Sequence, residues 1–342
     1  MERSFAAWAG TLILFNLHVE VGMVDILEDG TLGAGSLAED IDKKRFMNSI
    51  LSMSDLSNYF IASEIGRAFQ EKYILAKEMI RLDGKMLEDA LRPYFAAIVL
   101  LAYSGEAIST SKVAELVRSA GLDPERKIME FISALKIRNI FPYATAILFI
   151  KLLNREASLE SIVPVINSIG IRPDISLSIS AISEYESIAG EGQIREKIRF
   201  SFEKDILSLS AQISHLLSLE LERTFSNKEI AEEFESFSPY LSALSLLIFT
   251  GRDSDSEGNF NMRGLSNILN SIGIKGDDAI LNTIGNMSYG KATSVIYVPA
   301  IYLIRSAGKN PDVEKIKKIM YALQLPYDDA AAGYVLTVCN IK

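Results

Sequence analysis

The sequence predicts an all-α protein built from tandem three-helix units. Three observations lead to this prediction: four segments share one residue pattern, apolar residues recur at helical spacing, and only nine prolines interrupt 342 residues. Hydrophobic residues make up 49% of the chain and charged residues 23%, so a large core can be buried and general disorder is excluded.

Each of the four segments opens with a short, almost wholly apolar stretch that contains a tyrosine near its start. The tyrosines are Tyr94, Tyr143, Tyr240 and Tyr297. The residues eleven positions later are Gly105, Asn154, Gly251 and Gly308, and both residue types tolerate the left-handed conformation that ends a helix. A proline near each start supplies the fixed φ of a first turn. We therefore expect four buried first helices, with each tyrosine hydroxyl near a polar partner.

A second and a third helix follow in each segment. The second helix ends at Gly121, Gly170, Gly273 or Gln324, sixteen positions after the first stop except in the third copy, which carries six extra residues. Four residues past each of these stops lies an acid, at Glu125, Asp174, Asp277 or Asp328. An acid suits the first turn of a third helix, where free backbone N–H groups and the helix dipole favour negative charge.

These patterns divide the chain into four units and three other segments. Unit 1 is 93–140, unit 2 is 141–190, unit 3 is 239–291 and unit 4 is 292–342. The segments 59–92 and 191–238 are predicted to be long amphipathic helices, each placed directly before two units. This order indicates an internal duplication in which each long helix lies against the two units that follow it.

A degenerate fifth unit at 1–58 is an alternative that the sequence leaves open. Phe5 stands eleven positions before Asn16, and the intervening residues resemble a first helix. Residues 19–27 and 41–50 would then supply the second and third helices of this unit.

The unit resembles the N-terminal dimerisation domain of the acidic ribosomal stalk P-proteins of archaea and eukaryotes. Unit 4 carries the resemblance in its Tyr-x-x-Ala-Ile-x-Leu-x-x-Ser-Ala-Gly308-Lys opening, in the run Val313–Leu323, and in the Pro-Tyr-Asp328-Asp-Ala start of its third helix. Unit 1 matches through Tyr94, Gly105 and the run Ser-Ala-Gly121-Leu-Asp. The resemblance implies that two units pair as in a dimer and that the pair holds a long spine helix.

The partner implied by this resemblance is a protein helix, either of a ribosomal stalk base protein or of a second copy of the chain. Stalk proteins normally carry one unit, followed by an Ala/Gly-rich hinge and an acidic tail that recruits translation GTPases. The printed sequence shows neither feature after unit 4. The expected function is therefore helix holding and oligomer formation, with association with the ribosome.

Charge and motif content predict a non-catalytic protein without cofactors. The 44 acidic and 35 basic residues give a net charge of −9, which argues against a protein that coats nucleic acid through phosphate contacts. The two histidines, His18 and His215, stand apart from residues that would complete a triad or a metal site. Gly190-Glu-Gly192 lacks the lysine of a phosphate loop, and Cys339 lies in an apolar stretch typical of a core.

The six extra residues of unit 3 contain one candidate metal site. Asp253, Asp255 and Glu257 alternate along the chain and are followed by Gly258, as at the start of a calcium loop. The twelfth position of such a loop requires a bidentate Glu and is Gly264 here. A polar loop exposed to solvent is therefore the preferred interpretation, with calcium binding as the minor alternative.

The same sequence features predict a cytoplasmic protein that does not enter a membrane. One cysteine excludes an internal disulfide, and no secretory cleavage pattern follows the N-terminal apolar segment. That segment, 5–17, is shorter than the roughly 20 residues that span a bilayer. Two alternatives to a stalk-like scaffold remain: an unrelated helical-repeat array, and a helical bundle that binds a small ligand.

Overall fold

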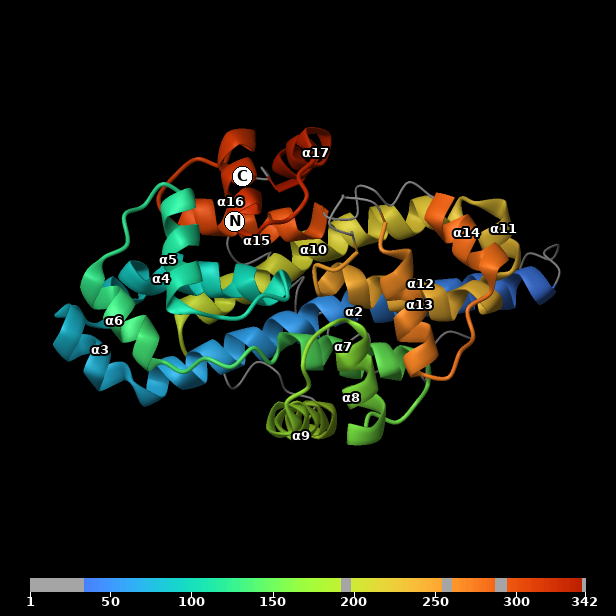
Figure 1. The fold of residues 1–342 in the computed structure, drawn as a ribbon, viewed down its shortest axis with the longest axis horizontal. Helices are drawn as coiled ribbons and strands as arrows, with labels where there is room; N and C mark the ends of the chain where they lie inside the picture. The colour runs from blue at the N-terminus through green and yellow to red at the C-terminus, as the bar shows by residue number, and fades with distance from the viewer. Residues whose placement is uncertain (1–33, 192–197, 254–259, 287–293, 340–342) are drawn as a thin grey trace, which may run out of the picture.

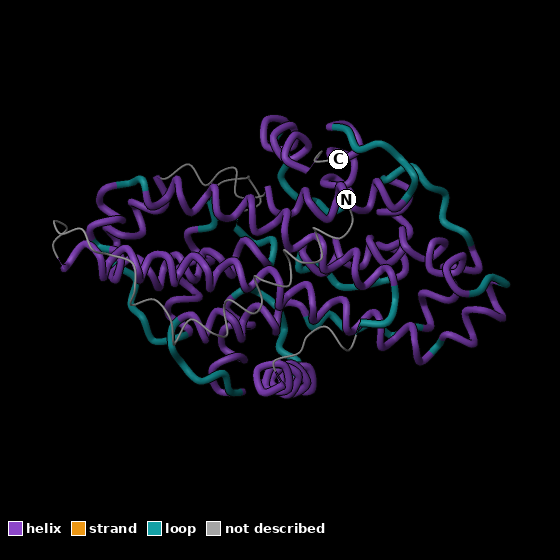
Figure 2. Tube along the Cα trace, turned by 180° about the vertical axis from the view of Figure 1, so that it is seen from behind, coloured by secondary structure: helices purple, strands orange, loops and turns teal. Residues whose placement is uncertain are grey.

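The computed structural model describes residues 34–191, 198–253, 260–286 and 294–339. These residues form sixteen α-helices, and no strand occurs among them (Figures 1 and 2). The all-α fold class predicted from the sequence is confirmed. The segment 5–17 and the expected second helix of a fifth unit lie outside the described residues.

Two long helices cross the centre of the molecule and pack against each other along their length (Figure 1). They are α2 (Ala34–Glu71) and α10 (Ser201–Phe225), and we call them the spine helices. They run antiparallel, because Leu51 contacts Ser214 whereas Gln70, near the end of α2, contacts Arg199. The spine contact buries an apolar stripe at steps of three and four residues on each helix, for example Phe202, Ile206, Leu209 and Ile213 on α10.

Each predicted unit contains three successive helices. In unit 1 these are α4 (Gly84–Tyr103), α5 (Thr110–Ser119) and α6 (Arg126–Ala134), and in unit 2 α7 (Phe141–Leu152), α8 (Leu159–Ser168) and α9 (Ile175–Glu191). Unit 3 has α12 (Phe234–Phe249), α13 (Met262–Ser271) and α14 (Asp278–Asn286), and unit 4 has α15 (Ser294–Ser306), α16 (Val313–Ala322) and α17 (Asp329–Cys339). Two short helices, α3 (Tyr73–Ile80) and α11 (Lys228–Glu232), join the spine helices to units 1 and 3. The superposition of the four units as copies stays a prediction.

The predicted helix stops all have a left-handed backbone. These residues are Gly105, Gly121, Asn154, Gly170, Gly251, Gly273, Gly308 and Gln324, with φ between 55° and 87°. After each stop, the next N–H bonds to the carbonyl five residues earlier, as from Glu106 to Leu101 at 3.1 Å. This is the Schellman arrangement, which satisfies carbonyls that a helix end would otherwise leave free.

A tyrosine of the first helix ties down the start of the third helix in every unit. The hydroxyl oxygen accepts a hydrogen bond from a backbone N–H: Tyr94 from Glu125 at 2.8 Å, Tyr143 from Asp174 at 2.8 Å, Tyr240 from Asp277 at 2.7 Å and Tyr297 from Asp328 at 3.0 Å. In units 2 to 4 the aspartate in turn caps the third helix, as Asp328 does for the N–H of Ala331 at 2.7 Å. All four tyrosines are buried. We call this arrangement the tyrosine clamp.

The first spine helix differs from the prediction at both of its ends. It begins at Ala34 instead of residue 59, so residues 41–50 belong to α2 and not to a separate third helix of a fifth unit. It ends at Glu71, and the rest of 59–92 forms α3 and the start of α4. Sequence periodicity missed the early part because Ser54, Ser57 and Asn58 are fully buried, and these polar residues interrupt the apolar stripe.

The second spine helix is also shorter than the predicted 191–238. It covers Ser201–Phe225, because Asn227 starts a new helix by accepting the N–H of Glu229 with its side chain at 3.0 Å.

The first helices of units 1, 3 and 4 begin upstream of their prolines, so Pro93, Pro239 and Pro299 lie inside helices. Only α7 has its proline, Pro142, in the first turn as predicted.

The units do not pair as 1 with 2 and 3 with 4, which corrects the arrangement predicted from the duplication. Unit 1 packs on unit 4 through α4 with α15 and α5 with α16, and unit 2 packs on unit 3 through α7 with α12 and α8 with α13. In Figure 1 units 1 and 3 lie at opposite ends of the molecule and units 4 and 2 at opposite edges. The antiparallel spine contact causes this exchange, because it places the end of each spine helix beside the start of the other.

Each spine helix lies against one pair of units. α2 packs on α7 and α12, the first helices of units 2 and 3, while α10 packs on α4 and α15, the first helices of units 1 and 4. A spine helix therefore does not lie against the two units that follow it, but against one unit from each half of the chain.

The tyrosine clamp gives a testable prediction. We expect Tyr143→Phe to lower the free energy of unfolding by about 0.5–1.5 kcal/mol, because the backbone N–H of Asp174 loses its part-buried hydrogen-bond partner. Tyr321→Phe is the matched control, since that side chain is 62% exposed, and should change stability by less than about 0.5 kcal/mol. Urea unfolding followed by circular dichroism measures both, and equal effects would contradict the clamp.

Candidate functional site

The spine helices meet through a small buried polar network at their midpoint. Ser54 donates to the carbonyl of Ser210 at 3.3 Å, and Ser210 donates to the carbonyl of Ser54 at 3.4 Å. Asn58 donates to the Ser210 hydroxyl at 2.9 Å and accepts from the hydroxyl of Tyr103 on α4, also at 2.9 Å. The reciprocal bonds place an approximate twofold axis between two residues 156 positions apart. A buried polar contact of this kind fixes the register of the two helices, because a slip leaves its groups unsatisfied.

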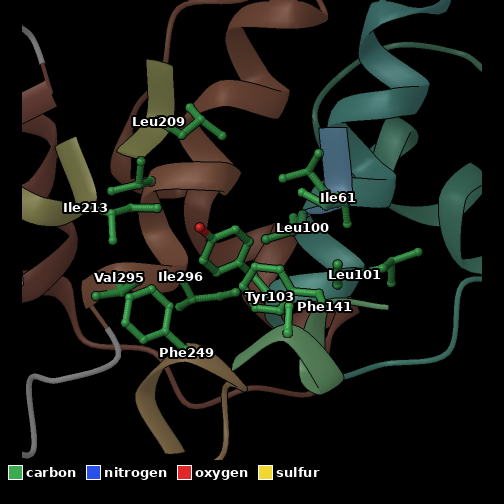
Figure 3. Close-up of a cluster of buried hydrophobic side chains, with 14 of the residues drawn as sticks. Ile61, Leu100, Leu101, Tyr103, Phe141, Leu209, Ile213, Phe249, Val295 and Ile296 are labelled. Atoms are coloured by element: carbon green, nitrogen blue, oxygen red, sulfur yellow. The ribbon is translucent and has the colours of Figure 1, made fainter. Parts of the chain in front are cut away.

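The residues around this network form one apolar core that draws on all parts of the fold. Figure 3 shows side chains from both spine helices and from all four first helices gathered in one cluster. They include Ile61 from α2, Leu100 from α4, Phe141 from α7, Ile213 from α10, Phe249 from α12 and Ile296 from α15. The spine helices therefore cover the first helices of all four units.

Basic side chains connect the paired units where second helices end. Arg155 of unit 2 donates to the carbonyl of Ile272, the last residue before the stop of α13 in unit 3, at 2.5 Å. A Cβ at Gly170, the stop of α8, would lie 3.6 Å from the guanidinium of Arg252, and one at Gly121, the stop of α5, would lie 3.6 Å from the chain of Lys309. Helix C-termini carry partial negative charge, so a cation from the partner unit stabilises them.

A cavity of about 410 Å³ lies where the four units meet. Its lining includes Glu106 of unit 1, Gly170 of unit 2, Arg252, Arg263 and Asn267 of unit 3, and Gln324 of unit 4. Arg252 is half-buried, and its guanidinium lies between Gly105 and Gly170, with a long contact of 3.4 Å from Nη2 to the Gly105 carbonyl. Burial lowers the pKa of Arg252, because its charge is partly removed from water. We call this space the junction cavity.

The candidate calcium loop starts beside this cavity. Asp253 is buried, and its backbone carbonyl accepts the N–H of Asn261 at 2.8 Å, which closes the loop. Burial raises the pKa of the Asp253 carboxyl to about 7. Asp255 and Glu257 lie outside the described residues, and no group of three or more potential metal ligands occurs within the described ranges. Calcium binding at this loop stays untested.

An apolar groove of about 340 Å³ runs between α10 and α17. Leu216 and Leu219 line it from the spine helix, Ala330, Ala331 and Tyr334 line it from α17, and Glu220 and Arg223 lie at its edge as an ion pair. Leu219 and Tyr334 remain 36% and 49% exposed. We call this the α17 groove.

The corresponding place on α2 is closed by an ion-pair network. Glu64 and Arg67 stand on α2 in the same spacing as Glu220 and Arg223 on α10. The buried Glu64 carboxylate accepts hydrogen bonds from Nε and Nη2 of Arg138, in the segment between α6 and α7, at 3.1 and 3.0 Å, and it also accepts from Arg67. Burial raises the pKa of Glu64, but the hydrogen bonds from the two arginines outweigh this effect and lower it. Arg138 also contacts Ser180 of α9 at 3.4 Å and thereby links α2 to α9.

A second polar cluster joins α10 to the pair formed by units 1 and 4. Arg92 on α4 lies 3.1 Å from Asp205 on α10, and the hydroxyls of Tyr302 and Ser306 on α15 are buried beside this ion pair. Burial raises the pKa of Tyr302 and of Asp205. Sequence reasoning did not find this cluster, because its residues come from three separate helices.

The remaining sequence candidates lie at separate places in the fold. Cys339 is buried, and burial raises the pKa of its thiol to about 11, which disfavours the reactive thiolate. His215 is exposed on α10, and Gly190 lies in the last turn of α9. His18 and Gly192 lie outside the described residues.

The chain matches no protein-family model, no curated protein and no solved structure. No helix within the described ranges combines the length and the apolarity that a bilayer crossing needs.

Asp253 gives a prediction about pH. Its folded-state pKa near 7 lies above the ordinary value of 3.8, so the folded state holds this proton more tightly than the unfolded state between these values. The resulting stability is present below pH 4 and is lost as pH rises through 7, by at most about 1.4 kcal/mol per pH unit. We expect Asp253→Asn to remove this loss, as measured by urea unfolding at pH 5 and pH 8. The exposed Asp123→Asn is the control, and a parallel pH profile for both variants would contradict the assignment.

Proposed function

We propose that this chain is a non-catalytic helical scaffold related in fold to the dimerisation domain of the ribosomal stalk P-proteins. One observation carries the proposal: in both pairs, first helix meets first helix and second helix meets second helix, with a long helix lying across the pair. This is the contact pattern of a twofold dimer that holds a spine, and the chain contains it twice.

The contact pattern favours this function over an unrelated helical-repeat array. In a repeat array each unit contacts its neighbour in sequence through a uniform translation. Here the first unit packs on the last, unit 1 on unit 4, and units 1 and 2 do not form a pair although they are neighbours in sequence. In each pair, helices at equivalent positions of the two units face each other, which is typical of an isologous interface.

The partner site in this proposal is the α17 groove. In the resemblance, a partner helix lies across each pair of units, but here the chain's own spine helices, α2 and α10, occupy those places. Its lining is apolar at the centre, with exposed Leu219 and Tyr334, which suits the apolar face of an amphipathic helix. The corresponding glutamate on α2, Glu64, forms an ion pair with Arg138, from the segment between α6 and α7. We therefore assign to the α17 groove a protein helix that brings aliphatic anchors for Leu216 and Leu219 and a basic residue for Glu220.

The experiment is sedimentation of the purified full chain with purified ribosomes of the organism that encodes it. The chain should pellet with the ribosomes. Leu219→Asp should stay in the supernatant, because a charge in the centre of the groove must be desolvated on binding. Ile175→Asp is the matched control, since Ile175 is 52% exposed on α9, away from the groove, and this variant should pellet like the parent.

Each outcome decides one part of the proposal. If the parent chain does not pellet, association with the ribosome is wrong. If the parent and both variants pellet equally, the α17 groove is not the partner site.

A further inference from the structure

The junction cavity has a charge distribution that the scaffold alone does not explain. Neither Arg252 nor Arg263 forms a close ion pair among the described residues, although the Glu106 carboxylate lies near enough to favour the charge of Arg252. The one acid in the lining, Glu106, has its carboxylate engaged by Lys112. Two arginines and one carboxylate that Lys112 also engages leave net positive charge at this cavity, which an anion would neutralise.

Arg252 has more hydrogen-bonding capacity than its surroundings use. A guanidinium has five N–H donors, and here one makes the long 3.4 Å contact to the Gly105 carbonyl while the buried Nε has no hydrogen-bond partner in the described residues. The ends of α4 and α8 account for a positive charge at this place. The helix ends do not use the remaining N–H donors of Arg252, so these donors can bind a ligand.

Arg263 is not accounted for by a helix end. It stands in the first turn of α13, one turn before Asn267, so the two side chains lie on the same face of the helix and both line the cavity. Both are exposed at the rim, with Gln324 of unit 4 across from their unit. The cavity thus has a half-buried arginine, Arg252, and exposed side chains with hydrogen-bond donors in its lining.

We infer that the junction cavity binds a small phosphate monoester, with Arg252 and Arg263 holding the phosphate and Asn267 and Gln324 contacting the remainder. Guanidinium groups recognise phosphate oxygens through paired N–H donors. The volume of about 410 Å³ exceeds what a bare phosphate fills and falls within the range of small-molecule sites. The polar rim suits a hydroxylated compound such as a sugar phosphate.

Binding at this place would stabilise the contact between the two pairs of units. All four units contribute to the lining, so a ligand that binds only the folded arrangement raises its stability by mass action. This inference does not depend on a ribosomal partner, and its test uses the isolated chain.

The test is isothermal titration calorimetry of the full chain with ribose 5-phosphate, and with ribose and inorganic phosphate as probes of each half of the ligand. Ribose 5-phosphate should bind and raise the melting temperature, inorganic phosphate should bind more weakly, and ribose should not bind. Arg263→Gln should weaken binding about tenfold or more, because one charge-assisted hydrogen bond is lost. Arg118→Gln, an exposed arginine on α5, is the matched control and should bind like the parent.

A second variant separates binding from folding. Arg252→Lys keeps a positive charge near the helix ends but loses the planar fork, so it should fold, as shown by circular dichroism, and bind more weakly. If neither ribose 5-phosphate nor inorganic phosphate binds at ligand concentrations of about 10 mM, the inference is overturned. Equal binding by the parent and Arg263→Gln would overturn it as well.

Discussion

The antiparallel contact between the two spine helices is the constraint on which the rest of the structure depends. The first helices are apolar on almost every side, and in α7 every residue from Phe141 to Ile150 is buried, so they need cover that a unit of under 50 residues cannot supply. The spine helices give this cover from the centre. Their register, fixed by Ser54 and Ser210, then determines which units can meet.

The register also explains why the halves of the chain interleave. The aromatic contact of Phe69 with Phe202 at one end of the spine corresponds to that of Phe225 with Phe46 at the other, with ring centroids 5.6 and 6.4 Å apart. Each end of the spine contact therefore brings residues of both halves together. Because unit 1 follows the end of α2 and unit 3 follows the end of α10, they come to opposite ends of the molecule, and each completes a pair with a unit from the other half.

The sequence predicted what is local and missed what is long-range. The tyrosines, the left-handed stops and the acids at the third helices lie within about one unit of each other, so their spacing alone indicated a shared layout. The pairing of unit 1 with unit 4 depends on the antiparallel spine, which no local pattern encodes. The start of α2 was missed because buried Ser57 and Asn58 look like solvent-facing residues in a periodicity argument. The junction cavity was missed for the same reason as the spine register, since its lining comes from four units.

The junction cavity arises where the approximate symmetry is broken. The residue after the first stop is basic in three units, at Arg155, Arg252 and Lys309, and each reaches the end of a second helix in its paired unit. In unit 1 this residue is Glu106, which binds Lys112 of its own unit instead. A basic residue at that position would extend toward the stop of α16 at Gln324, in the same way that Arg252 extends toward Gly170. The substitution to an acid leaves this contact unmade, and Glu106 and Gln324 both line the open space that results. The departure from the repeated pattern in unit 1 thus coincides with a place where all four units border a cavity.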